Sequence, residues 1–367
     1  FNYSAGSYIG DLRKEKPHIS KSILVFSIAI NLVALGYYKY FSFLAGEFLT
    51  AFDIAIDKPI SIALPIGISF FTFTQIAYLV DVYRGVARES RPANYMLFVS
   101  YFPHLIAGPI LHHKEMMPQF SDINKAIVNR ERIADGAGIF LIGLAKKLLI
   151  ADPLGFYANK FFSGVSAGAP PAFIESLTGS LAYTLQLYFD FSGYSDMAVG
   201  VSLIFGIVLP INFNSPYRSM NIIEFWRRWH MTLSRFLRDY LYIALGGNRK
   251  GNFQRYTNLL LTMLLGGIWH GAGWTFIAWG ALHGVYLIIN HGWRFATDRL
   301  QVPPKIHSLL SPAYFVVTFT AVLIAWIPFR AASLGDAWIV IKGIFGGNGV
   351  ALPTQIASLI PNLPKWV

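Results

Sequence analysis

Residues 221–291 read NIIEFWRRWHMTLSRFLRDYLYIALGGNRKGNFQRYTNLLLTMLLGGIWHGAGWTFIAWGALHGVYLIINH. This stretch begins with a segment rich in Arg, Trp and His and passes through a basic turn at 246–251. It ends in a long apolar run that holds His270 near its centre. Ionisable side chains at membrane depth are rare and usually functional. We therefore hypothesise that two histidines, His230 and His270, mark a reaction site inside a membrane protein.

The composition of the whole chain points the same way. Of the 367 residues, 54% are hydrophobic and 13% are charged, and the mean hydropathy is +0.47. A soluble domain usually carries about 25% charged residues. Half that fraction, with repeated apolar runs of membrane-spanning length, predicts an all-α polytopic membrane protein. The chain has no cysteine, which excludes disulfides, thiolate metal sites and a cysteine nucleophile.

The net charge of +11 fits a membrane protein rather than a nucleic-acid-binding protein. Lys and Arg collect in the cytoplasmic loops of membrane proteins and set their orientation, so we expect membrane lipid and no nucleic acid as a partner. On this rule the basic segments 11–21 and 81–91 are cytoplasmic, and the acidic loop 45–59 lies outside.

The apolar runs predict roughly nine to eleven membrane segments. Clear spans are expected at 22–43, 60–80, 136–157, 257–271, 274–291 and 312–329, and shorter or interrupted ones at 95–111, 172–189, 197–211 and 336–345. Pro65 and Gly67 break the second span early. Residues 112–135 are polar enough for an interfacial helix. We expect one transmembrane domain over residues 1–367, with further membrane segments beyond both ends.

Residues 222–240 predict one amphipathic helix. At 100° per residue, the aromatic and aliphatic side chains share one face, and Arg227, Ser234 and Arg238 share the opposite face. His230 falls on a boundary between the two faces, with Arg228 on the other flank. The helix is too charged to span a bilayer, so we expect it at an interface or along an aqueous cavity.

The charge of the region around this helix leaves two interpretations open. Residues 213–256 hold eight Lys or Arg against two acids, which predicts a cytoplasmic position. The basic face could anchor the protein to anionic lipid, with His230 incidental. It could equally bind a phosphate-bearing cofactor such as coenzyme A.

His270 has the stronger case for chemistry. It lies in a run, Leu259 to Ile289, that holds one other histidine, His283, and no Lys, Arg, Asp or Glu. Glycines at 266, 267, 271 and 273 bracket it and allow close approach by another helix or a substrate. A neutral imidazole there could act as a general base. The alternative is a histidine that hydrogen-bonds across helices, which is the interpretation that we favour for His283.

The segment Asp190 to Asp196, YFDFSGYSD with its two preceding residues, is unusually polar for its apolar setting. Asp190, Tyr194 and Asp196 could orient a histidine, line a polar tunnel or only clamp helices together. His112 and His113 are adjacent and no third ligand follows at metal spacing, so we expect no metal site.

Several long motifs together resemble the membrane-bound O-acyltransferases. They are LPIGISF (64–70), YLVDVYRG (78–85), FPHLIAGP (102–109), QLYFDFSGYSDM (186–197), EFWRRWH (224–230), RDYLYI (238–243, continuing to 251) and GIWHGA (267–272). The match is similar to the bacterial branch typified by the membrane subunit of alginate O-acetyltransferase. It covers nearly the whole chain.

The resemblance implies a ring of tilted transmembrane helices around a central funnel or tunnel, with interfacial and re-entrant helices. It implies that His270 is the catalytic histidine and that His230 is a second histidine near the tunnel. It further implies multi-pass insertion in a bacterial inner membrane and a cytoplasmic thioester donor. The acetyl group would pass to an extracytoplasmic partner acetyltransferase that decorates a polysaccharide. Trp269, Tyr194 or a backbone N–H could stabilise the oxyanion.

Three functions therefore compete. The first is O-acetylation of an alginate-like exopolysaccharide, with no bound cofactor and acetyl-CoA or another thioester as donor. The second is transfer of D-alanine or another acyl group to teichoic acid or peptidoglycan by a related branch. The third is a transporter or channel without acyl-transfer chemistry, for which loss of His270 would leave acetylation unchanged.

Overall fold

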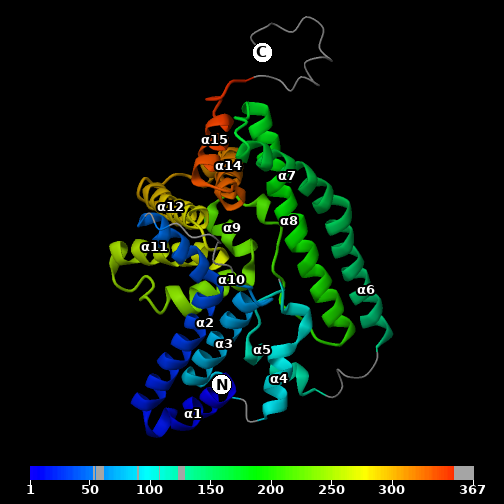
Figure 1. Cartoon of the computed structure of the whole chain (residues 1–367), viewed down its shortest axis with the longest axis vertical. Helices are drawn as coiled ribbons and strands as arrows, with labels where there is room; N and C mark the ends of the chain where they lie inside the picture. The colour runs from blue at the N-terminus through cyan, green and yellow to red at the C-terminus, as the bar shows by residue number, and fades with distance from the viewer. Residues whose placement is uncertain (53, 55–61, 89–90, 107, 123–128, 351–367) are drawn as a thin grey trace, which may run out of the picture. The chain divides into compact units, whose positions relative to one another are not determined.

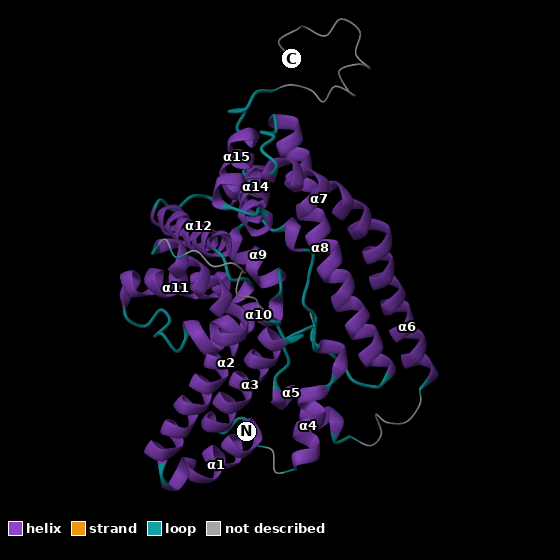
Figure 2. Cartoon of the chain, viewed as in Figure 1, coloured by secondary structure: helices purple, strands orange, loops and turns teal. Residues whose placement is uncertain are grey.

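The computed structural model describes residues 1–52, 54, 62–88, 91–106, 108–122 and 129–350. Every regular element in these ranges is a helix, as Figure 2 shows. The prediction of an all-α protein is confirmed. A ring of helices around a funnel, and a single domain over the whole chain, stay predictions.

The described helices form two compact units. Unit 1 comprises Phe1–Gly143, Tyr194–Asn212 and His230–Ala244. Unit 2 comprises Leu144–Gly193, Phe213–Trp229 and the described part of Leu245–Val367. The candidate histidine His230 therefore belongs to unit 1 and His270 to unit 2.

Three packed helices open unit 1: α1 (Asn2–Glu15), α2 (Pro17–Ala51) and α3 (Ile68–Arg84) (Figure 1). Pro17 is suited to the first turn of α2, where its missing N–H costs no hydrogen bond. Buried amides of Asn2 and Asn31 exchange hydrogen bonds of 3.0 and 2.8 Å between α1 and α2. The helix that contains the first predicted span is thus longer than 22–43, and α2 extends into the predicted outer loop 45–59, of which residues 53 and 55–59 lie outside the described residues.

Within the second predicted span, 60–80, the helix begins only after Gly67. The sequence indicated this through Pro65 and Gly67, which interrupt the span early. Gly67 has φ of 74°, and a Cβ there would lie 2.5 Å from the carbonyl oxygen of Leu105. The interrupted character of 95–111 is also confirmed. This stretch holds the end of α4 (Pro92–Ser100) and the short helix η1 (Phe102–His104). Helix α5 (His113–Phe120) follows, inside the predicted interfacial region.

Helices α6 (Arg130–Ala145) and α7 (Asp152–Ser166) are joined by a π-helical turn, η3 (Lys146–Ala151). The next helix, α8 (Phe173–Ile204), runs through the polar segment 190–196 without a break. The prediction of two separate apolar segments at 172–189 and 197–211 is therefore wrong. A polar side chain on this helix can bond back to the helix itself, as when Thr184 donates to the carbonyl of Ser180 at 2.8 Å.

Unit 2 contains the helical hairpin of α11 (Gly251–His270) and α12 (Trp274–Arg299), whose two helices lie side by side (Figure 1). Gly267 and Gly280 face each other at the crossing. A Cβ on Gly267 would lie 2.3 Å from the carbonyl oxygen of Phe276, so one bracketing glycine serves helix packing. The unit continues with α13 (Pro304–Leu309), α14 (Ser311–Arg330) and α15 (Leu334–Ile344).

Fewer helices meet the criteria for a membrane span than the apolar runs of the sequence predict. Within the described ranges, two helices, α2 and α14, are both long and apolar enough to cross a bilayer. The predicted count of nine to eleven segments stays a prediction.

The single helix predicted over 222–240 is wrong. The chain forms α9 (Ile222–Arg228) in unit 2, then α10 (Met231–Phe236) and the π-helical turn η5 (Leu237–Tyr242) in unit 1. The break lies at Trp229 and His230, and His230 adopts a left-handed conformation with φ of 41°. The predicted apolar face is nonetheless confirmed as the buried one, with Phe225 and Leu233 each 1% exposed.

Candidate active site

His270 is the last residue of α11 and lies among aromatic rings of unit 2. Its ring centroid is 4.9 Å from that of Trp269, 4.8 Å from Trp279 and 5.2 Å from Phe329, all in edge-on arrangements. Trp279 is 1% exposed and comes from α12, and Phe329 comes from α14. Three helices thus fix the position of an imidazole that keeps partial exposure.

The glycines around His270 make this position possible. Gly271 is extended, and a Cβ on it would meet the ring of Phe276 at 2.1 Å. Gly273 is also extended and opens α12. The chain therefore turns immediately after His270 within three residues, which leaves the imidazole at a helix end rather than in a helix interior.

His283 is placed as a structural residue, as predicted from the sequence. It is fully buried, and the indole N–H of Trp226 donates to its Nδ1 at 3.3 Å. Phe225 stacks on the same ring at 6.0 Å with an interplanar angle of 7°. His283 thus belongs to the aromatic core of unit 2.

Of the charged candidate residues in unit 2, Asp190 and Arg228 form ion pairs and Arg227 is exposed. Lys147 forms an ion pair with Asp190 at 2.8 Å and a second one with Asp152 at 2.7 Å. Arg228 is paired with Glu224 at 2.8 Å, one helical turn away. Arg227 is exposed and makes no ion pair within the described part of the chain. Of the two arginines of α9, Arg227 is therefore the one available to an anionic ligand.

His230, in unit 1, is surrounded by polar groups. It is 1% exposed, its Nδ1 lies 3.3 Å from Oδ1 of Asn212, and its ring stacks on Phe70 at 6.5 Å. The same Asn212 oxygen accepts from the hydroxyl of Thr232 at 2.7 Å, and the Asn212 carbonyl accepts from the N–H of Met231 at 2.9 Å. Asn212 therefore stabilises both the position of the imidazole and the break in the helix beside it.

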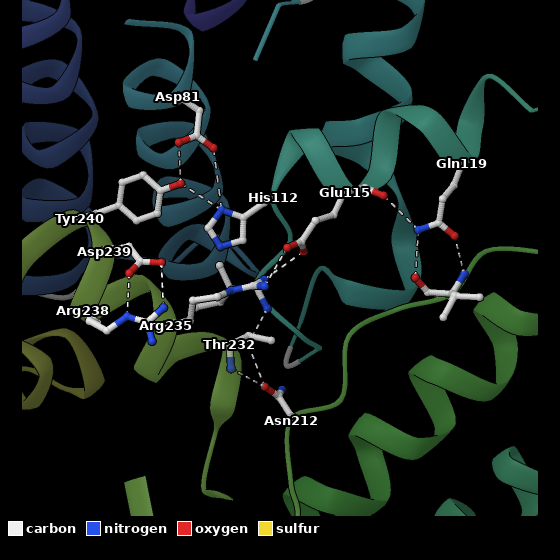
Figure 3. Close-up of polar contacts among 12 residues, drawn as sticks. Asp81, His112, Glu115, Gln119, Asn212, Thr232, Arg235, Arg238, Asp239 and Tyr240 are labelled. Atoms are coloured by element: carbon white, nitrogen blue, oxygen red, sulfur yellow. Dashed lines mark hydrogen bonds and ion pairs between the residues drawn. The ribbon is translucent and has the colours of Figure 1, made fainter. Parts of the chain in front are cut away.

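A second polar cluster of unit 1 joins side chains from α3, the start of α5, α10 and the π-helical turn η5 (Figure 3). The Tyr240 hydroxyl donates to Asp81 at 2.8 Å and lies 3.0 Å from Nδ1 of His112. Because that hydroxyl donates its proton to Asp81, Nδ1 of His112 is the donor in the second bond. Next to them, Arg235 forms a bidentate pair with Glu115 at 2.7 and 3.0 Å.

These residues line a cavity of about 400 Å³ together with Arg84, Lys114 and Asp239. Burial raises the pKa of Asp81, and the hydrogen bond from Tyr240 opposes that shift. Burial and the nearby Arg235 charge lower the pKa of His112 to about 4, so its ring is neutral at pH 7. Burial and the Asp81 charge raise the pKa of Tyr240. The cluster is a hydrogen-bonded chain of neutral or paired groups.

This second cluster was not predicted from the sequence as a candidate site. Asp81 and Tyr240 lie in the motifs 78–85 and 238–243, which was a usable signal, but Glu115 lies in none of the motifs. Arg238, predicted to bind the donor, is bidentate to its neighbour Asp239 at 2.7 and 3.2 Å. A salt bridge between adjacent residues is not visible in an ideal helical projection, because residues i and i+1 diverge on an α-helix.

The remaining candidates are half-buried side chains on the helices of unit 1. Tyr194 and Asp196 lie in the last part of α8, where Tyr194 packs against the apolar cluster around Phe98. Ser234 lies on α10, one turn after His230, and its N–H donates to the carbonyl of His230 at 3.0 Å. Over the described residues, no group of three or more His, Cys, Asp or Glu side chains is placed to hold a metal ion.

Comparison with known proteins gives consistent results. The family model of the membrane-bound O-acyltransferases matches residues 68–327. A peptidoglycan O-acetyltransferase of Helicobacter pylori is 45% identical over 96% of this chain and 69% of its own length. A probable alginate O-acetylase, AlgI, of Pseudomonas aeruginosa is 44% identical over 94% of this chain and 64% of its own length. A teichoic acid D-alanyltransferase of Bacillus subtilis is 33% identical over 60% of this chain and 58% of its own length.

The chain spans about two thirds of the length of the two O-acetyltransferase relatives that it matches. The aligned regions cover 96% and 94% of this chain. The family match extends over α3 to α14 and contains both His230 and His270. The chain therefore belongs to the membrane-bound O-acyltransferase family of enzymes, in the branch that contains the alginate O-acetylases, as its motifs predicted.

Proposed function

We propose that this chain carries the acetyl-transfer centre of a membrane O-acetyltransferase that modifies an extracytoplasmic polysaccharide. One observation carries the proposal. Relatives named for two different polymers, alginate and peptidoglycan, match the chain almost equally, at 44% and 45% identity. The D-alanyltransferase of Bacillus subtilis reaches 33%. The two closer relatives share the acetyl group rather than the acceptor, and this favours acetyl over D-alanyl transfer.

His270 is the proposed general base. Its imidazole would take the proton of the attacking acceptor hydroxyl as the oxygen bonds to the carbonyl carbon of the acetyl thioester. The carbon–sulfur bond then breaks, and the leaving thiolate receives the proton from the imidazolium. Support comes from the edge-on rings of Trp269, Trp279 and Phe329, which hold the imidazole in one place at a helix end. Trp269 or a backbone N–H is the proposed donor to the developing oxyanion.

The donor is proposed to be acetyl-CoA or another anionic acyl thioester that arrives from the cytoplasm. The excess of Lys and Arg over residues 213–256 would attract it electrostatically. Arg227 is favoured for direct contact because Arg228 and Arg238 are already engaged by carboxylates. We further propose a multi-pass position in the bacterial inner membrane and an extracytoplasmic acetyltransferase as the partner that receives the acetyl group.

The experiment compares His270→Ala with His18→Ala in cells that lack their own copy of the gene and express the full-length protein. His18 is an exposed histidine on α2 and serves as the matched control. Acetyl content is measured on both the secreted polysaccharide and the peptidoglycan. We expect His270→Ala to lose acetylation by about 100-fold or more, the size of a lost general base, at normal membrane levels.

The same experiment tests the alternatives. An unchanged acetyl content in His270→Ala at normal protein level would refute the catalytic assignment. The polymer that loses its acetyl groups identifies the acceptor. Polymer export that depends on the protein, with no acetyl transfer in the wild type, would establish the transporter function instead.

A further inference from the structure

Unit 2 contains an apolar groove that the acyl-transfer proposal does not use. It has a volume of about 550 Å³ and lies between the end of α12 and the start of α14. Its walls include Tyr286, Asn290 and Trp293 from α12, and Tyr314, Val317 and Ala321 from α14. The lining is mostly apolar, with aromatic side chains from both helices. A groove of this composition suits a hydrocarbon chain rather than a polar metabolite.

The groove lies where two predicted membrane spans end. The apolar run of α12 ends near His291, and the run of α14 begins near residue 312. The groove residues 286–293 and 310–321 straddle both limits. Trp and Tyr side chains prefer this depth, where the hydrocarbon meets the headgroups. The connecting segment 292–311 holds three Lys or Arg against one Asp, which predicts the cytoplasmic side.

A cation lies next to the groove. Arg294 follows the groove residue Asn290 by one helical turn, so the two share a flank of α12. Arg294 is exposed and forms no ion pair with a carboxylate among the residues that the structure describes. Its positive charge is therefore not balanced within unit 2.

One buried polar atom completes the site. Oδ1 of Asn290 is shielded from solvent and accepts no hydrogen bond from the described residues. An orphaned buried acceptor costs free energy unless a ligand or water supplies a donor. A glycerol hydroxyl of a lipid headgroup placed at the rim would supply that donor.

From the groove, its depth, the unbalanced Arg294 and the orphaned amide oxygen, we infer that unit 2 binds an anionic phospholipid of the cytoplasmic leaflet. One acyl chain would occupy the groove between α12 and α14. The phosphate would lie against Arg294, with a headgroup hydroxyl donating to Asn290. This site is separate from His270 and does not depend on the proposed chemistry.

The test uses the full-length protein extracted from vesicles of equal parts phosphatidylglycerol and phosphatidylcholine, and measures retained lipids by native mass spectrometry. The wild type is expected to retain phosphatidylglycerol preferentially. Arg294→Gln should lower the ratio of the two lipids roughly fivefold, the effect of one basic residue at an anionic headgroup. Arg299→Gln is the matched control, since it is an exposed arginine on the opposite side of α12 and should leave the ratio unchanged.

A second variant tests the groove itself. Ala313 is exposed at the groove, so Ala313→Trp fills the space without disturbing the core, and it should reduce retention of both lipids. An unchanged lipid ratio in Arg294→Gln, or unchanged retention in Ala313→Trp, would overturn the proposal. Displacement of the bound lipid by inorganic phosphate would also overturn it and would assign the rim to free phosphate. No retained lipid in the wild type would overturn the proposal as well.

Discussion

His270 and His230 are held by different kinds of contact. In unit 2, the His270 ring lies 4.8 to 5.2 Å from three aromatic rings at the end of a regular helix. In unit 1, His230 lies in a backbone break with φ of 41°, and Asn212 contacts both its imidazole and the next residue. Ring contacts from three helices fix where the His270 imidazole lies. A hydrogen bond commits one nitrogen to a fixed partner.

This difference separates the proposed roles. The His270 imidazole keeps partial exposure at a helix end, which suits proton exchange with a substrate. An imidazole that is 1% exposed and bound to an asparagine is suited to hold a segment or a substrate in place. We therefore assign the base to His270 and a positioning role to His230, and the following variants test that contrast.

The largest effect is expected from the hairpin that carries His270. Gly267→Val would place a Cβ 2.3 Å from the carbonyl oxygen of Phe276 on a neighbouring helix. Overpacking of a tight contact costs about 1–3 kcal/mol or more, and here backbone has to move. The thermal midpoint of the purified protein should fall sharply. Gly292→Ala is the control, because nothing lies within 4 Å of a Cβ there. Equal midpoints for the two variants would contradict the packing account.

The next effect is expected at the break. His230→Asn keeps a residue type that tolerates the left-handed conformation, so the fold should persist. Acetylation in cells should fall about tenfold because the shorter amide cannot replace the imidazole at a fixed position. Membrane level and thermal midpoint are measured alongside. If the variant acetylates as well as the wild type, His230 has only a structural role. If the variant protein no longer accumulates in the membrane, the imidazole is needed for the fold.

The hairpin could be predicted from the sequence, because its signals are local. Apolar runs at 257–271 and 274–291, separated by Gly271 and Gly273, specify two helices and a tight turn. The structure places α11 and α12 there and extends both at their polar ends. The roles of His283 in the core and of Gly267 in close packing also followed from residue type and setting.

The break could not be predicted, because its cause lies far away in the sequence. Residues 222–240 have a helical pattern, and the apolar face is buried as the pattern indicates. The interruption depends on hydrogen bonds from Met231 and Thr232 to Asn212, about twenty residues earlier. The cluster of Asp81, His112 and Tyr240 has the same origin, since it joins segments up to 159 residues apart. Tertiary contacts of this kind override local propensity.

A smaller effect is expected from pH at the Tyr240 cluster. The folded pKa of His112, about 4, lies below the unfolded value of about 6.5, so the unfolded chain binds more protons between these values. Lowering the pH through this window should therefore destabilise the protein through His112. The raised pKa of Asp81 acts in the opposite direction.

His112→Gln isolates the histidine contribution. The thermal midpoint of the variant should fall less than that of the wild type between pH 6.5 and pH 4. The slope of midpoint against pH is the quantity to compare, since the substitution also changes the contact to Tyr240. Identical slopes would show that His112 is not held neutral by its surroundings.

The smallest effect is expected at the exposed arginine of α9. Arg227→Gln should raise the KM for the acyl thioester about two- to fivefold, with little change in kcat, because a solvent-exposed cation attracts an anionic donor weakly and salt screens it. Arg228→Gln, which breaks the pair with Glu224, should change KM less. A change confined to membrane insertion in both variants would support the lipid-anchor interpretation of this segment instead.

The central claim is that His270 takes the proton in acetyl transfer, and proteoliposomes of the full-length protein test it most directly. Acetyl thioester is supplied on the cytoplasmic side, and thiol release coupled to acetyl transfer is measured for the wild type and for His270→Gln at equal protein content. The account predicts a rate at least about 100-fold lower in the variant with donor binding unchanged. A rate within threefold of the wild type would contradict it.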